Sequence, residues 1–154
     1  MTPARFQLVT LNTWKCDGAW RQRMALMAPQ LQALAPDAVA LQECFVAEDG
    51  SADTAALLGR ATGLQAQVLR ARHKLRAFEG RPVASWSCQT LLSAHAVRHT
   101  HDVVLPCPPG DDDRRAQLVQ LDVHGYRVTV ANVHLTHLPD QPDLPDASDG
   151  LAPH

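Results

Sequence analysis

Three stretches of the sequence end in side chains that could bind a metal ion or a phosphate group. RFQLVTLN ends in Asn12, AVALQE ends in Glu43, and YRVTVANVH ends in Asn132 and His134. Each stretch is apolar enough to form a buried strand, and alternate residues of a strand share one face. By this alternation, each polar side chain lies on the same face as the apolar residues that precede it in its strand. Because a buried carboxylate is costly unless it is paired or metal-bound, we expect one polar site at the rim of a packed sheet. Solvated strand ends are the ordinary alternative.

A predicted hairpin adds an arginine to this set. Residues 115–123 and 126–135 are predicted to be strands joined by the two-residue turn His124-Gly125. The resulting register keeps apolar residues opposite one another, and it places Arg115 beside His134 on the same face. A guanidinium is well suited to grip a phosphate, although a structural cross-strand role for Arg115 is equally open.

The remaining pattern predicts an α+β protein built on one mainly antiparallel sheet with flanking helices. The apolar period over residues 18–35 predicts a helix that Asp17 could cap and Pro29 should kink or split. A second helix is expected over residues 52–62. Weaker strand candidates and a loop complete the pattern, at residues 64–70, 84–93, 97–105 and 106–113. The Pro/Asp-rich run 139–154 has little to bury and is expected to be disordered.

Composition limits the classes of function. The chain has 154 residues, a net charge of −2 and 45% hydrophobic residues, which is typical of a globular domain without a strong field for nucleic acid or membrane. No run is long and apolar enough to be a membrane span, and the N-terminal stretch does not look like a signal peptide. The four cysteines form no CxxC pair, so reduced thiols and a cytoplasmic location are expected.

Several motifs together resemble the endonuclease/exonuclease/phosphatase superfamily of DNase I-like hydrolases. The motifs are Leu11-Asn12-Thr13-Trp14, the run from Pro36 to Glu43, Arg115-Ala116-Gln117-Leu118, and Val130-Ala131-Asn132-Val133-His134-Leu135. The resemblance implies the N-terminal half of a four-layer α/β/β/α sandwich, with a partial domain over residues 1–138. It also implies a metal-dependent phosphodiesterase or phosphatase activity on a phosphoester substrate of unknown class.

The resemblance assigns a role to each matching residue. Glu43 corresponds to the metal-ligating glutamate and Asn12 to the asparagine that supports the metal, so Mg²⁺ or Mn²⁺ is expected to bind, weakly, through one carboxylate and one amide. His134 and Asn132 correspond to catalytic residues at the scissile phosphate, and Arg115 to an arginine that faces the phosphate.

Two later motifs of the superfamily have no counterpart in the sequence. These are the Gly-Asp-Phe/Tyr-Asn motif and the C-terminal Asp-His pair, which orient and activate the attacking water. We therefore expect a truncated chain that is inactive alone, with a complementing chain or an oligomer covering an exposed sheet face. The alternative is a non-catalytic fragment or interaction module derived from the same superfamily.

Two other clusters allow further interpretations. His95, His99 and His101 could form a zinc or nickel site, but histidines on a solvated strand are the usual case. The basic run 70–76 could line a phosphate-rich groove, but a solvated loop is favoured because no aromatic residue interrupts it.

Overall fold

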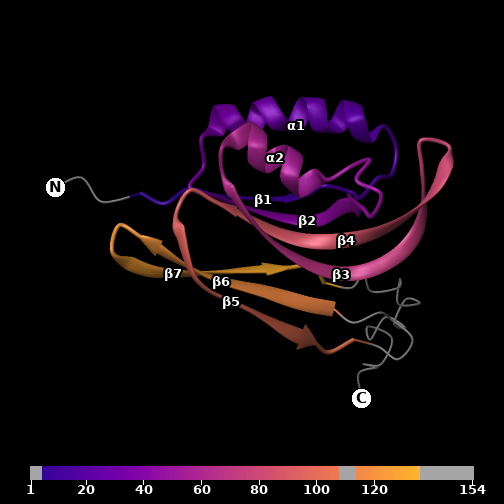
Figure 1. The fold of residues 1–154 in the computed structure, drawn as a ribbon. Helices are drawn as coiled ribbons and strands as arrows, with labels where there is room; N and C mark the ends of the chain where they lie inside the picture. Colours follow the sequence, from indigo (N-terminus) through magenta and orange to yellow (C-terminus); the bar gives the residue numbers. More distant parts are fainter. Residues whose placement is uncertain (1–4, 108–113, 136–154) are drawn as a thin grey trace, which may run out of the picture.

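The computed structural model describes residues 5–107 and 114–135, which form two sheets and two helices stacked in three layers. Both helices cover one face of the larger sheet, and the smaller sheet packs against its other face (Figure 1). The resulting order of layers is helices, sheet, sheet. The expected α+β class is confirmed. Among the described helices, none is long and apolar enough to cross a membrane.

The larger sheet has four strands in the order β1-β2-β4-β3. Strand β1 pairs in parallel with β2, and the other pairs are antiparallel. The bounds of these strands are β1 Leu8–Asn12, β2 Ala38–Ala47, β3 Gln65–Phe78 and β4 Arg81–Ser93. Strands β2 and β4 lie at the centre of the sheet, and most of their residues are buried. The buried central strands therefore hold the residues at the ends of the sheet in fixed positions.

The smaller sheet has three antiparallel strands in the order β5-β6-β7. Its strands are β5 Ala96–Leu105, β6 Arg114–Val123 and β7 Tyr126–Val133. The predicted hairpin register is confirmed, because Val119 pairs with Val130 and Gln117 pairs with Asn132. Both turn residues, His124 and Gly125, have positive φ angles, as the favoured two-residue hairpin turn requires.

The two helices bury the core on the outer face of the larger sheet. Helix α1 spans Trp20–Leu34 and α2 spans Thr54–Thr62. Pro29 lies inside α1 without dividing it, and Asp17 does not cap it, because the helix starts after Ala19 with no side-chain cap. Asp53 caps α2, and Gly63 ends it in the left-handed conformation. Trp20, Phe45 and Phe78 pack edge-on or tilted in this core.

The expectation of a single sheet was wrong, and the reason is the pairing of distant strands. Strands β5–β7 form a sheet of their own that packs on β2, β3 and β4. A second apolar core fills the space between the sheets, with Ala38, Ala40 and Leu91 on one side and Val119, Leu121, Val123 and Val130 on the other. The chain therefore covers the inner face of its larger sheet with its own residues.

Two smaller expectations also need comment. The basic run 70–76 is part of strand β3 rather than a loop. The predicted tail 139–154 and most of the predicted loop 106–113 lie outside the described residues.

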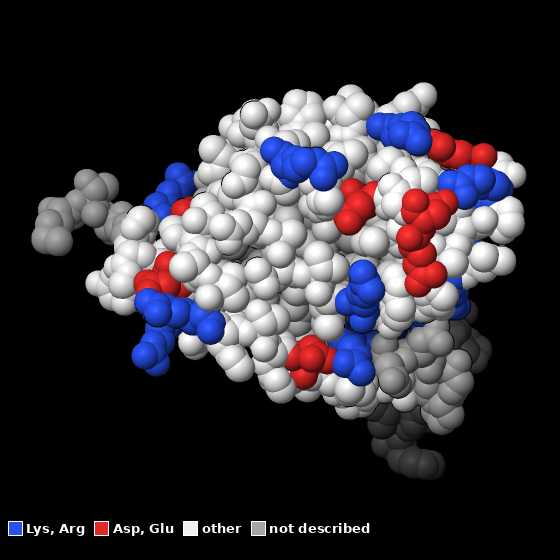
Figure 2. Space-filling model, in the orientation of Figure 1, with Lys and Arg blue, Asp and Glu red and all other residues white. Residues whose placement is uncertain are grey.

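The four cysteines are free, three of them buried. On the face shown in Figure 2, basic and acidic side chains are interspersed, in keeping with the small net charge.

Candidate functional site

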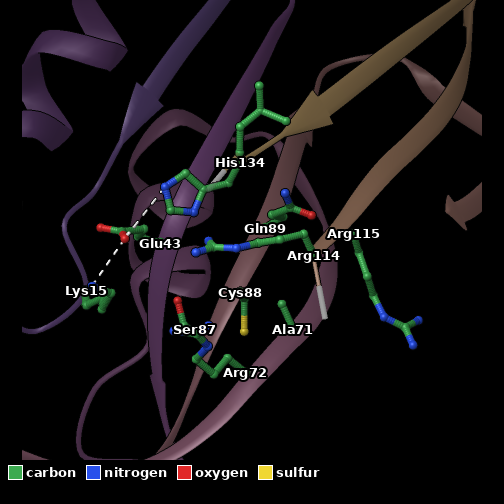
Figure 3. Close-up of a pocket in the computed structure, with 11 residues that line it drawn as sticks. Lys15, Glu43, Ala71, Arg72, Ser87, Cys88, Gln89, Arg114, Arg115 and His134 are labelled. Carbon is green, nitrogen blue, oxygen red and sulfur yellow. Dashed lines mark ion pairs between the residues drawn. The ribbon is translucent and has the colours of Figure 1, made fainter. Parts of the chain in front are cut away.

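A pocket of about 460 Å³ opens between the two sheets, beside an irregularity in the middle of β2 and next to the end of β7. Its walls carry four basic side chains and one carboxylate, together with His134 (Figure 3). The charged residues are Lys15, Arg72, Arg114, Arg115 and Glu43. Among the described residues, Glu43 is the only acidic lining residue, so the pocket is suited to an anion.

Glu43 reaches this pocket through a bulge in β2. Residues Val39 and Leu41 face the helices, and strict alternation would send Glu43 into the same apolar core. The register of β2 against β4 shifts between Leu41 and Cys44, and Glu43 adopts a left-handed φ of 55°. Bulges redirect side chains in this way and are frequent beside functional sites. The side chain of Glu43 is 13% exposed and points toward His134.

His134 approaches Glu43 from the other sheet. Its Nε2 atom lies 3.7 Å from Oε1 of Glu43, which is too far for a hydrogen bond and gives an ion pair only when the imidazole is protonated. Burial lowers the pKa of His134; Glu43 opposes this shift and Arg114 adds to it. The lowered pKa favours the neutral form of the imidazole. Glu43 and His134 are the two sequence-predicted site residues that the structure brings together.

The arginine beside His134 is Arg114 rather than Arg115. Arg114 points into the pocket toward Glu43, whereas Arg115 points away from it (Figure 3). The guanidinium of Arg115 is paired with the carboxylate of Asp102 on β5. The sequence motif pointed to the neighbouring arginine because the alternation of side chains was extended to the first residues of the strand.

Asn132 lies between the two sheets and is not a lining residue of the pocket. It is 1% exposed. Its amide donates to the backbone oxygens of Leu41 at 2.9 Å and Thr90 at 3.2 Å, and to Oε1 of Gln117 at 3.3 Å. Its Oδ1 accepts from Nε2 of Gln42 at 2.7 Å. These hydrogen bonds join the two sheets beside the bulge of β2 that carries Glu43.

Asn12 is exposed at the end of β1 and also lies outside the pocket lining. Its Oδ1 accepts the backbone N–H of Trp14 at 2.8 Å, a local turn that starts the loop before α1. Lys15 and Arg72 are pocket residues that the sequence motifs did not single out. The basic run 70–76 was the only signal for Arg72, and nothing in the sequence signalled Lys15.

Comparison with known proteins extends this description. No family model matches the sequence, and no curated protein does either. Among solved structures, an endonuclease/exonuclease/phosphatase family protein from Leptotrichia buccalis matches with a TM-score of 0.68 at 10% identity, over 86% of this chain and 54% of its own. An endonuclease/exonuclease/phosphatase from Beutenbergia cavernae matches with a TM-score of 0.64 at 23% identity, over 84% and 38%. The human Nocturnin catalytic domain with bound sulfate anion matches with a TM-score of 0.57 at 16% identity, over 82% and 48%.

The chain therefore has the same fold as these endonuclease/exonuclease/phosphatase proteins, the DNase I-like fold. The resemblance seen in the motifs is confirmed at the level of the fold. The chain spans about half or less of the length of the solved structures that it matches.

The divalent cation implied by this superfamily can be tested against the donor atoms of the pocket. Among the described residues, no group of three or more His, Cys, Asp or Glu side chains is arranged to hold a metal ion. The one carboxylate of the pocket, Glu43, is 3.2 Å from the ammonium of Lys15. Hard cations prefer several oxygen ligands, and Asn12 does not join the pocket. The described residues therefore do not form a complete site for Mg²⁺ or Mn²⁺.

Proposed function

We propose that this pocket binds the phosphate group of a phosphoester and is part of a phosphoester hydrolase site. The carrying observation is that Glu43 and His134, which come from different sheets, meet in a pocket lined with basic residues on a DNase I-like fold. Arginine and lysine side chains fix phosphate oxygens by charge-assisted hydrogen bonds. A sulfate anion in the matching Nocturnin structure is in keeping with an anion site on this fold.

The pocket residues supply one half of what hydrolysis needs. Arg114 and Lys15 stabilise negative charge on the phosphoryl oxygens, and neutral His134 can donate a hydrogen bond to one of them. No described lining residue other than Glu43 could accept a proton from an attacking water as a carboxylate. Glu43 is itself paired with Lys15. We therefore expect the pocket to bind phosphate without activating the attacking water efficiently.

We accordingly propose that the 154-residue chain hydrolyses phosphodiesters slowly or not at all. Loss of a general base typically lowers a rate by about 10²–10⁴-fold. The roles that the motifs predict stay predictions: catalysis by His134 and Asn132, phosphate contact by Arg115, and metal binding by Glu43 and Asn12. A complementing chain, or a second copy, would have to supply the missing groups. The nature of the phosphoester substrate is not part of the proposal.

Calorimetric titration with inorganic phosphate tests the binding function. The wild-type chain should bind phosphate, and His134→Ala should weaken binding about tenfold, which is the loss of one hydrogen bond to a charged group. His101→Ala is a matched control, because His101 is exposed on β5 outside the pocket. Failure of the wild-type chain to bind phosphate, with or without Mn²⁺, would refute the proposed function.

Hydrolysis of bis(p-nitrophenyl) phosphate and of plasmid DNA, with Mg²⁺ or Mn²⁺, tests the proposed inactivity. Turnover by the purified chain should stay near the uncatalysed rate. Robust turnover that His134→Ala abolishes would show that the chain completes its site, and the proposed inactivity would then be wrong.

A further inference from the structure

We propose that Lys15 is a built-in cation for the Glu43 carboxylate, so that the pocket binds a phosphate-type anion without a divalent metal. The inference rests on the proposed function of the pocket, and it specifies the cation that the site uses. Three observations carry it: the position of Lys15, the way its loop is held, and the charges that surround the pair.

The first observation is the ion pair itself. The Nζ atom of Lys15 lies 3.2 Å from Oε1 of Glu43 (Figure 3). The side chain of Glu43 is 13% exposed and that of Lys15 is 31% exposed, so the pair is partly shielded from water. Such pairs are screened less by salt than pairs on an open surface. A divalent cation that bound Glu43 would be repelled by this ammonium.

The second observation is that the loop carrying Lys15 is fixed in an unusual conformation. Trp14 and Lys15 have left-handed φ angles of 56° and 45°. Residues with side chains rarely adopt this conformation, and they keep it only where the surroundings enforce it. The backbone N–H of Lys15 donates to the oxygen of Glu43 at 2.9 Å. The loop is thereby attached to the same bulge that presents the Glu43 carboxylate.

Arg23 of helix α1 completes this attachment. Its guanidinium donates to four backbone oxygens of the loop, those of Thr13 at 3.1 Å, Trp14 at 3.2 Å, Lys15 at 3.1 Å and Asp17 at 2.7 Å. The same group lies 5.2 Å from the centre of the Trp14 ring. We call these four hydrogen bonds the Arg23 clamp. They fix the loop, and so they fix the position of Lys15 next to Glu43.

The third observation is the charge of the surroundings. Besides Glu43 and Lys15, the charged residues that line the pocket are three arginines. A phosphate in this pocket would meet the Lys15 ammonium and the Arg114 guanidinium, with His134 beside them. These are donors for an anion, and they oppose the entry of a second cation. These side chains are suited to bind an anion directly, and they are not suited to bind a metal ion that would then hold the anion.

Phosphate titrations in the presence of EDTA test this inference. The wild-type chain should bind inorganic phosphate without metal, and Lys15→Met should weaken that binding about tenfold or more. Lys74→Met is the matched control, since Lys74 on β3 is the other lysine of the chain and does not line the pocket. In parallel, Mn²⁺ affinity should rise about tenfold in Lys15→Met, and Glu43→Gln in that background should remove the gain.

A spectroscopic readout is independent of both affinities. With two lysines in the sequence, selective isotope labelling gives two sets of lysine side-chain resonances, and Lys74→Met assigns them. Phosphate in EDTA should shift the Lys15 signal and leave the Lys74 signal unchanged. Phosphate binding by the wild-type chain that requires Mn²⁺, or binding in EDTA that Lys15→Met leaves unchanged, would overturn the inference while the proposed function stands. Absence of phosphate binding with and without Mn²⁺ would overturn the proposed function itself.

Discussion

At the scale of single residues, Asn132 shows how a motif residue can act on the site through the fold. Its amide reaches backbone oxygens of β2 and β4, and it lies within the interface between the sheets. We predict that Asn132→Leu lowers the free energy of unfolding by about 2–3 kcal/mol, because buried acceptors lose their donor. Chemical denaturation measures this change.

Thr129→Leu provides the control for that prediction. Thr129 is exposed on the same strand and should change stability by less than about 0.5 kcal/mol. Equal effects of the two substitutions would contradict the interface role of Asn132. A fold that survives Asn132→Leu would also allow phosphate binding to be measured without the amide, which tests the catalytic role expected from the motif.

Asp37 provides a second prediction at this scale, at the end of the sandwich that carries His95 and His124. The backbone N–H of Gln7 donates to its carboxylate at 2.7 Å, and Nε2 of His95 lies 2.9 Å away. These contacts lower the pKa of Asp37 below its ordinary value of 3.8. A lowered pKa means that the folded state binds the proton less well than the unfolded state.

The stabilisation from Asp37 is therefore complete above the ordinary pKa and is lost as pH falls through the lowered one. We predict that Asp37→Asn lowers the free energy of unfolding by about 1 kcal/mol at pH 7. The difference from the wild type should shrink between about pH 5 and pH 2. Urea denaturation over this range measures it, and a difference that is constant with pH would contradict the assignment.

At the scale of elements, the loop between β1 and α1 depends on one arginine of the helix. We predict that Arg23→Lys lowers the free energy of unfolding by about 1–2 kcal/mol, because one ammonium cannot replace a guanidinium that bonds four carbonyl oxygens. Hydrogen exchange at the Lys15 amide should become faster. Arg21→Lys is the control, since Arg21 is 63% exposed in its pair with Glu79 and should matter by less than about 0.5 kcal/mol.

The elements also show what the sequence could and could not predict. The β6–β7 register was predictable, because a two-residue turn fixes the pairing of the strands that it joins. The division into two sheets was not, since it depends on which distant strands pair with one another. The roles of Val39 and Leu41 in the core followed from their apolar pattern, but the bulge that frees Glu43 from that pattern leaves no trace in residue types.

The same distinction applies to the site. Glu43 and His134 were found because short motifs carry them, one at a bulge inside β2 and the other just after β7, and the two side chains meet in the structure. Lys15 and Arg114 were missed because a loop conformation and a side-chain direction place them, and Arg72 was included only in a basic run for which a solvated loop was favoured. These features depend on tertiary contacts such as the Arg23 clamp. The motifs thus predict two residues of the pocket, whereas the basic character of the pocket can be seen only in the three-dimensional structure.

At the scale of the whole molecule, the two sheets leave a pair of edge strands on the same side. Strand β1 pairs only with β2, and β7 pairs only with β6, among the described strands. Strand β7 packs across β2 and β4, whereas β6 packs across β3 and β4, so the edges of β1 and β7 lie toward one side of the sandwich. Unpaired edges are templates for strand addition by another chain.

Exposed apolar side chains strengthen this interpretation of the edges. Leu8 on β1 is 47% exposed and Val133 on β7 is 37% exposed. We predict that the purified chain self-associates through this side, so that its average mass in sedimentation velocity rises with concentration. Leu8→Lys and Val133→Lys should each reduce the association, because charged side chains on an edge strand oppose pairing.

Leu75→Lys separates this edge from a general effect of added charge. Leu75 is 70% exposed on β3, the opposite edge of the larger sheet, and the substitution should leave the association unchanged. Association reduced equally by all three substitutions would point to a nonspecific apolar effect. A chain that stays monomeric at about 100 µM, a concentration at which even a weak dimer with a Kd in the micromolar range would form, would exclude this edge as a self-association surface. In that case a complementing partner of different sequence would be the remaining way to extend both sheets.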